Sequence, residues 1–264
     1  MRDVYHIPAN WLDEAVRVLL VGVGGNGSEM LDALARLHLS LVAMGHPAGL
    51  HVTAIDPDTV TEANIVRQRF YPAEIGQNKA LTAIQRMNIY FGLDWDAMPV
   101  ALDADALHNT DLVIGCVDNV AARNRIADFR DCALFQEQLY LDLGNGEHSG
   151  QIVLGHLACP DDAPIRLPIV QDLFPEIIEH EEHDEAPSCS AEESLQRQGF
   201  GINRTLATHS ANLLWHLFTQ GHIDHHGYLI DTRAGSVAPL RIDEQLWASL
   251  NGHHLDSTIA RVAA

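Results

Sequence analysis

The chain has 264 residues, enough for one large or two small domains with a sizeable core. Its composition, 47% hydrophobic and 20% charged, is that of a globular protein and excludes disorder as the main state. The balance of 16 basic against 36 acidic residues gives a formal charge of -20. That charge argues against nucleic acid or an anionic membrane surface as the main partner and favours a basic protein or peptide.

The N-terminal segment and the cysteines bear on location. Residues 1–14 are polar and lack the basic start and apolar core of a secretory signal. No apolar run approaches the roughly 18 residues that a membrane helix needs. Cysteines stand at positions 116, 132, 159 and 189, widely spaced and without a CxxC pair. We therefore expect a cytoplasmic protein with free thiols.

Short apolar runs alternate with segments of helical periodicity along the chain. We expect strands at residues 17–23, 50–55, 111–117, 139–143 and 151–157. We expect helices at residues 29–44, 78–91, 119–135 and 205–218. A closing hairpin is predicted at residues 228–231 and 237–242. The alternation predicts an α/β fold: a Rossmann-like, three-layer arrangement with a mixed, mostly parallel sheet and helices on both faces.

Residues 160–198 differ in character from the rest of the chain. They carry a dense acidic run and show no clear period. This pattern predicts a long acidic loop that crosses the surface at about residues 160–200. Because no repeat or clean linker is visible, we expect one domain over residues 1–264 with this loop inserted.

A glycine-rich turn follows the first predicted strand and opens the first long helix. Its glycines are Gly22, Gly24, Gly25 and Gly27. Glycines let the backbone approach a phosphate closely, and a helix N-terminus supplies free N–H groups and partial positive charge. Such a turn alone is a weak signal, and it is most often read as a nicotinamide or flavin site.

Three features lie at or just past the ends of predicted parallel strands. They are Gly24, Asp56 and Asp118. Ligands of open α/β sheets bind beyond the carboxyl ends of the strands, so we expect one crevice at these positions. An aspartate in the place of Asp56 would hydrogen-bond ribose hydroxyls, whichever nucleotide is bound.

The residues after Asp56 distinguish a nicotinamide or flavin site from another kind of nucleotide site. The stretch from Asp56 to Gln68 reads DPDTVTEANIVRQ, and IGQNKA follows at residues 75–80. With the glycine turn and Asp118, this order resembles the ThiF family, the adenylating enzymes that activate ubiquitin and ubiquitin-like proteins. Similarity to the ThiF proteins of the PRTRC plasmid-borne gene cluster covers nearly the whole chain, through the phrases GHP, GLDW, PSC and LLWHLF.

The resemblance implies a role for each motif residue. The glycine turn, Asp56 and Asp58 would bind the nucleotide of ATP, with Asp56 on the ribose. Asn64 and Gln68 would orient the phosphate region. Arg67 and Lys79 would contact phosphates, and Asp118 would bind Mg²⁺. The single lysine of the chain falls on the motif lysine.

The implied reaction is attack of a carboxylate on the α-phosphate of ATP, which gives an acyl-adenylate and pyrophosphate. The partner would be a small ubiquitin-like, β-grasp protein with a C-terminal glycine tail, together with a conjugating enzyme. The resemblance further implies that Cys189 takes over the acyl group as a thioester. Its acidic flanks would raise the pKa of the thiol, and a loop cysteine without a role stays an alternative.

Two departures from the family pattern matter. The two CxxC pairs that hold zinc in several members are absent, and zinc is not expected. No arginine-bearing segment precedes the first strand except Arg2, so a homodimer is compatible with the sequence but not required. Two other functions stay open: a nicotinamide-dependent oxidoreductase, which would leave Arg67, Gln68 and Lys79 unexplained, and a non-catalytic module that binds a ubiquitin-like protein.

Overall fold

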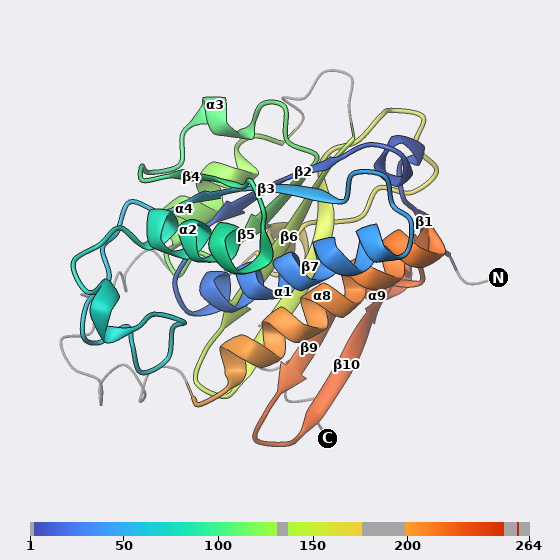
Figure 1. Ribbon diagram of the computed structural model, residues 1–264. Coiled ribbons are helices and arrows are strands. Elements are labelled where there is room, and N and C mark those ends of the chain that lie inside the picture. Colours follow the sequence, from blue (N-terminus) through green and yellow to red (C-terminus); the bar gives the residue numbers. More distant parts are fainter. Residues whose placement is uncertain (1–2, 131–136, 176–198, 251–257, 259–264) are drawn as a thin grey trace.

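The computed structural model of the protein describes residues 3–130, 137–175, 199–250 and 258. Within these ranges the main sheet has eight strands in the order β10-β9-β7-β6-β5-β2-β3-β4 (Figure 1). Its strands are β2 (Val16–Val21), β3 (Leu50–Ile55), β4 (Asp96–Met98), β5 (Leu112–Gly115), β6 (Gln138–Asn145), β7 (Ser149–Ala158), β9 (His225–Asp231) and β10 (Ser236–Arg241). A separate pair joins β1 (Tyr5–His6) to β8 (His222–Ile223).

The sheet has a parallel part and an antiparallel part. Strands β4, β3, β2, β5 and β6 pair in parallel, whereas β7, β9 and β10 extend the sheet antiparallel from β6. Val21 of β2 lies opposite Ile55 of β3 and Gly115 of β5. The carboxyl ends of the three strands are therefore level, as the sequence predicted, and the mixed α/β sheet is confirmed.

Helices cover both faces of the sheet, which makes three layers. One face carries α1 (Gly25–Ala43), α2 (Lys79–Phe91) and α8 (Ile202–Gln220), and α1 and α8 lie side by side (Figure 1). The other carries α3 (Ala104–Leu107), α4 (Val120–Ala127), α5 (Val170–Leu173) and α9 (Glu244–Leu250). Side chains alternate between the two cores along each strand: Val18 and Leu20 join the α1–α8 core, and Leu19 and Val21 join the other.

The predicted and observed elements differ at several bounds: α1, for example, begins at Gly25 rather than at residue 29, and α3, α5 and α9 were not predicted. The helix predicted at residues 119–135 is observed at Val120–Ala127, and residues 131–136 lie outside the described part of the chain. Helix α8 begins at Ile202, three residues before its predicted start. The edge strand β4 was missed because none of its side chains is fully buried and no apolar alternation marks it.

Part of the segment predicted as an acidic surface loop packs into the core. Ile169, Val170, Leu173 and Phe174 are buried on the second face of the sheet, and Leu167 is buried in the core on the α1–α8 face. These apolar residues were overlooked beside the acidic run that follows. Residues 176–198 lie outside the described residues.

No helix among the described residues is long and apolar enough to cross a membrane.

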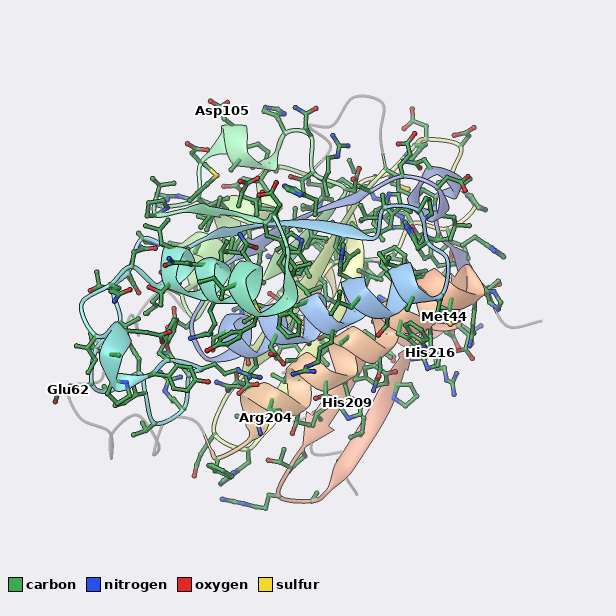
Figure 2. All side chains as sticks on the ribbon, viewed as in Figure 1. Met44, Glu62, Asp105, Arg204, His209 and His216 are labelled. Atoms are coloured by element: carbon green, nitrogen blue, oxygen red, sulfur yellow. The ribbon has the colours of Figure 1, made fainter. Side chains whose placement is uncertain are left out.

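Figure 2 shows Arg204, His209 and His216 along the outer side of α8, with Met44 just past the end of α1. Glu62 lies on the loop between β3 and α2.

A buried histidine links the antiparallel part of the sheet to α9. The indole Nε1–H of Trp247 donates to Nε2 of His226 at 2.9 Å, so Nδ1 carries the proton and donates to Leu154 O at 2.7 Å. Burial lowers the pKa of His226 from 6.5 to about 4. The native state therefore holds this ring neutral.

This pKa predicts a loss of stability in mild acid. As the pH drops, the unfolded state binds a proton at His226 near pH 6.5, but the native state binds it only near pH 4. The free energy of unfolding therefore decreases between these two pH values, by about 3 kcal/mol in all. His226→Gln should flatten that slope, and His222→Gln, at an exposed position, should not. Urea denaturation from pH 7 to pH 4.5 measures it; equal slopes in the two variants would contradict the assignment.

Candidate functional site

The turn after β2 packs so closely that it admits only glycine at key positions. Gly22 has φ +87°, and a Cβ there would lie 2.8 Å from Cys116 O at the end of β5. A Cβ on Gly27 would lie 1.9 Å from Gly22 O. Helix α1 begins directly at Gly25, and its first turn carries no acidic residue and receives no side-chain cap from Gly24. The free N–H groups of this helix end therefore favour an anion.

Asp56 ties the glycine turn to the end of β3. Its Oδ2 accepts from Val23 N at 2.6 Å, and its Oδ1 accepts from Asp58 N at 2.8 Å. Burial raises the pKa of the Asp56 carboxyl, while Lys79 and the two backbone donors offset part of that rise. Each carboxylate oxygen keeps capacity to accept a further hydrogen bond.

Lys79, the first residue of α2, lies beside Asp56 and Asp58. The preceding residue, Asn78, donates from Nδ2 to Asp56 O at 2.9 Å and to Asp58 O at 3.0 Å, which fixes the helix start against the strand end. Lys79 is 7% exposed, and its Nζ lies 3.0 Å from Oδ2 of Asp58. The side chain of Asp58 is 66% exposed, so an anionic ligand could take its place beside the ammonium.

Arg67 and Gln68 reach the glycine turn from the loop between β3 and α2. Glycine has no Cβ, but the place where one would stand measures how close a neighbour lies. Nη1 of Arg67 is 3.2 Å from the place of a Cβ on Gly25, and Nε2 of Gln68 is 3.9 Å from the place of a Cβ on Gly24. Gln68 is 8% exposed, and its Oε1 finds no hydrogen-bond partner among the described residues. Asn64 shapes the loop, accepting from Thr61 N at 2.9 Å through its side chain.

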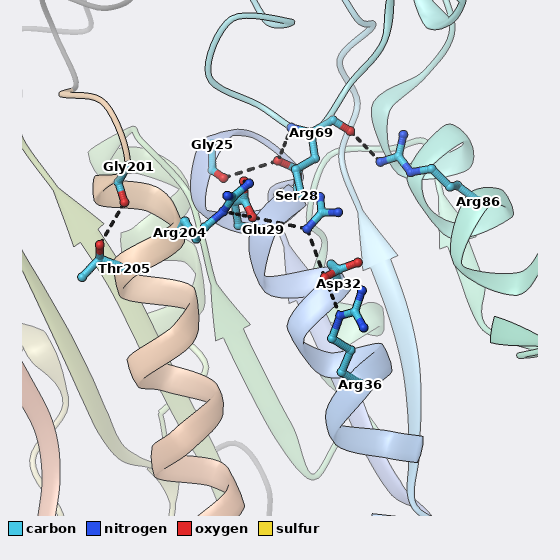
Figure 3. Close-up of polar contacts among 10 residues, drawn as sticks. All are labelled: Gly25, Ser28, Glu29, Asp32, Arg36, Arg69, Arg86, Gly201, Arg204 and Thr205. Atoms are coloured by element: carbon cyan, nitrogen blue, oxygen red, sulfur yellow. Dashed lines mark hydrogen bonds and ion pairs between the residues drawn. The ribbon is translucent and has the colours of Figure 1, made fainter. Parts of the chain in front are cut away.

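The same loop is fixed to the outer side of α1, as Figure 3 shows. Arg69 N donates to Ser28 Oγ at 3.0 Å, and the Arg69 guanidinium pairs with Asp32 at 3.0 Å and Glu29 at 3.5 Å. Arg86 of α2 donates to Arg69 O at 2.6 Å. These contacts hold Arg67 and Gln68 over the turn. The sequence analysis missed these contacts. The i, i+3 spacing of Glu29 and Asp32 was a signal that could have found them, because it places two acids on one face of the helix.

Asp118 lies on the loop after β5, next to the glycine turn, and is exposed. Its neighbour Val117 packs 3.4 Å from the position of a Cβ on Gly22. Behind the loop, Arg123 donates to Val117 O at 3.2 Å and to Asp142 Oδ1 at 2.9 Å. Asp142 is fully buried, so this ion pair fixes the loop that carries Asp118. The Asp118 residue itself is exposed to solvent.

The structure thus brings most of the predicted residues to one end of the parallel strands, around the glycine turn: Gly22, Gly24, Gly25, Gly27, Asp56, Asp58, Arg67, Gln68, Lys79 and, on the adjoining loop, Asp118. The side chain of Asn64 instead accepts within its own loop, from Thr61 N. Cys189 lies outside the described residues. Burial raises the pKa of the Cys116 thiol at the end of β5, so that thiol stays protonated and is a poor nucleophile. No group of three or more His, Cys, Asp or Glu that could hold a metal occurs in the described ranges.

The comparisons with known proteins agree with this arrangement. The ThiF family matches residues 12–260, and the chain belongs to that family. A stretch of 121 residues, 42% of the chain, is 36% identical to molybdopterin-synthase adenylyltransferase of Escherichia coli K12 and covers 43% of it. A stretch of 119 residues is 30% identical to adenylyltransferase and sulfurtransferase UBA4 of Yarrowia lipolytica and covers 27% of that protein. The matches thus span less than half of either relative.

The chain is also similar to a solved structure, that of selenomethionine PaaA; the match covers 86% of the chain described here and 64% of the PaaA chain. Its TM-score is 0.58 at 15% sequence identity, which supports the fold alone.

The tight glycine turn generates a stability prediction. Gly27→Ala brings a Cβ against the backbone at Gly22 O, which cannot move without shifting β2, so it should lower the free energy of unfolding by about 2–4 kcal/mol. Gly146→Ala is the matched control, because its nearest side-chain atom, Ser149 Oγ, is 4.0 Å away. Chemical denaturation of both variants measures the difference; equal unfolding free energies would contradict the packing described.

Proposed function

We propose that the protein adenylates the C-terminal carboxylate of a small ubiquitin-like, β-grasp protein at the expense of ATP. One observation carries this proposal: Asp56, Lys79 and Arg67 converge on a glycine turn whose helix N-terminus is uncapped. Membership of the ThiF family supports it, as do two relatives named adenylyltransferases.

The residues present fit ATP. Asp56 offers carboxylate oxygens to the ribose, while Arg67, Lys79 and the start of α1 offer cationic and N–H donors to the phosphates. The buried Oε1 of Gln68, unpartnered among the described residues, is left for a donor that the ligand would bring. Two cations beside the turn favour a triphosphate over a dinucleotide, which carries less charge at its phosphates.

The residues also fit a magnesium ion. Mg²⁺ in nucleotide sites is commonly held by one or two carboxylates plus substrate phosphates and water, so a protein cage of three ligands is not needed. Asp118 is an exposed carboxylate on the loop beside the turn and would be the protein ligand. When bound, the ion would offset phosphate charge.

In the proposed reaction a carboxylate oxygen of the partner attacks the α-phosphorus of ATP. The bond from that phosphorus to the bridging oxygen breaks, and pyrophosphate leaves with the electron pair. No protein nucleophile takes part in this step. Arg67 and Lys79 would stabilise the charge that builds on the phosphate oxygens, and Asp56 would hold the ribose so that the α-phosphate stays in line.

Several further features belong to the same proposal. We place the activity in the cytoplasm, in one domain over residues 1–264, with a conjugating enzyme as a further partner and a homodimer as an optional state. The likeness to the PRTRC group stays a prediction from the sequence.

ATP–pyrophosphate exchange in the presence of small ubiquitin-like proteins tests the activity. Asp118→Ala should reduce Mg²⁺-dependent exchange by at least about 100-fold, because the metal loses its protein ligand at a developing charge. Asp105→Ala removes an exposed carboxylate of α3 and should leave exchange unchanged. Exchange at wild-type rate in Asp118→Ala would overturn the metal assignment, and no exchange by the wild-type protein with any such partner would overturn the function.

The role of Cys189 is tested separately. If the cysteine takes the acyl group from the adenylate, Cys189→Ala should keep pyrophosphate exchange and lose the thiol-sensitive covalent adduct with the partner. Cys159→Ala, which removes another thiol, should keep both. Gel analysis with and without a reductant reads out the adduct. A wild-type protein that adenylates its partner without forming an adduct would show that Cys189 has no such role.

A further inference from the structure

Helix α8 brings a polar side chain to the glycine turn from the far end of the chain. Asn203, the second residue of α8, is 6% exposed. The position of a Cβ on Gly25 lies 1.8 Å from Nδ2 of Asn203, so the amide nitrogen sits directly against the glycine Cα. Gly25 is therefore needed not only for a ligand but also to make room for this amide.

The first turn of α8 is held in this place by an ion pair. Arg204, next to Asn203, pairs with Glu29 of α1 at 3.3 Å, and Figure 3 shows the two arginines Arg69 and Arg204 on either side of Glu29. The side chain of Glu29 is 10% exposed. The ion pair thus fixes α8 to α1 at Glu29, one helical turn after Gly25, and so holds Asn203 at the glycine turn.

The nitrogens around Gly25 form one donor set. The guanidinium Nη1 of Arg67 lies 3.2 Å from the same Cβ position that Asn203 Nδ2 approaches, and Gln68 lies beside Gly24. The first turn of α1 contributes N–H groups and no acidic side chain. The buried Oε1 of Gln68 at the same turn is an acceptor and is not part of this donor set; it is left for a hydroxyl or amino group of the ligand. An amide donor beside a guanidinium and a helix N-terminus suits an anionic oxygen.

We propose that Asn203 is a further binding residue of the nucleotide site, and that its side-chain amide donates to a phosphate oxygen of the nucleotide beside Arg67. This inference rests on the proposed use of ATP. It assigns to α8, which the sequence motif does not include, a direct part in phosphate recognition.

Equilibrium binding of ATP and of adenosine to the full chain tests the proposal. Asn203→Asp keeps the shape and turns the donor into a repelling carboxylate, so it should weaken ATP binding about tenfold or more and leave adenosine binding within about twofold. Asn203→Ala should weaken ATP binding less. Asn212→Asp makes the same change at an exposed position of α8 and should bind ATP like the wild-type protein.

A wild-type protein that binds no ATP would refute the proposed function. Normal ATP binding by the wild-type protein and by Asn203→Asp would refute the role of Asn203 alone. Should the variants fail to fold, NMR of the ¹⁵N-asparagine-labelled wild-type protein decides: the Asn203 side-chain amide must shift with ATP and not with adenosine, and no shift overturns the proposal.

Discussion

The site depends on how closely the turn after β2 packs against the chain around it. The turn touches the end of β5 at Cys116 O, folds onto itself between Gly22 and Gly27, and meets Asn203 of α8 at Gly25. Each contact leaves no space for a Cβ. These contacts fix the start of α1, so its free N–H groups are held beside side chains of two other segments, Arg67 and Asn203.

The charges around the turn are divided by function. On the β3 side, Asp56 and Asp58 are carboxylates, held by backbone N–H groups and by Lys79. On the α8 side, the groups that reach the turn are nitrogen donors. The acidic residues of that side, Glu29 and Asp32, lie further along α1 and are neutralised by Arg69, Arg204 and Arg36. A protein with a formal charge of -20 thus keeps a local surface for phosphate.

Much of the fold and most of the residues around the glycine turn could be predicted because their signals are local. β3 has the predicted bounds, Leu50–Ile55, and Asp56 lies at a strand end because parallel strands bring their carboxyl ends together. Asn203 and Arg204 could not be predicted in this way. Their contacts cross a separation of 175 residues in the case of Arg204 and Glu29, and they depend on α8 packing beside α1. The helical pattern marked the apolar face of α8 but not the polar residues of its first turn.

The central claim is that this crevice binds ATP, and direct competition between nucleotides tests it most simply. Isothermal titration of the wild-type protein with ATP and Mg²⁺, repeated in the presence of NAD, measures both affinities at once. The account predicts one ATP per chain, with NAD unable to displace it at equal concentration. Tighter binding of NAD than of ATP would contradict the account and would indicate that the glycine turn is a nicotinamide-dinucleotide site.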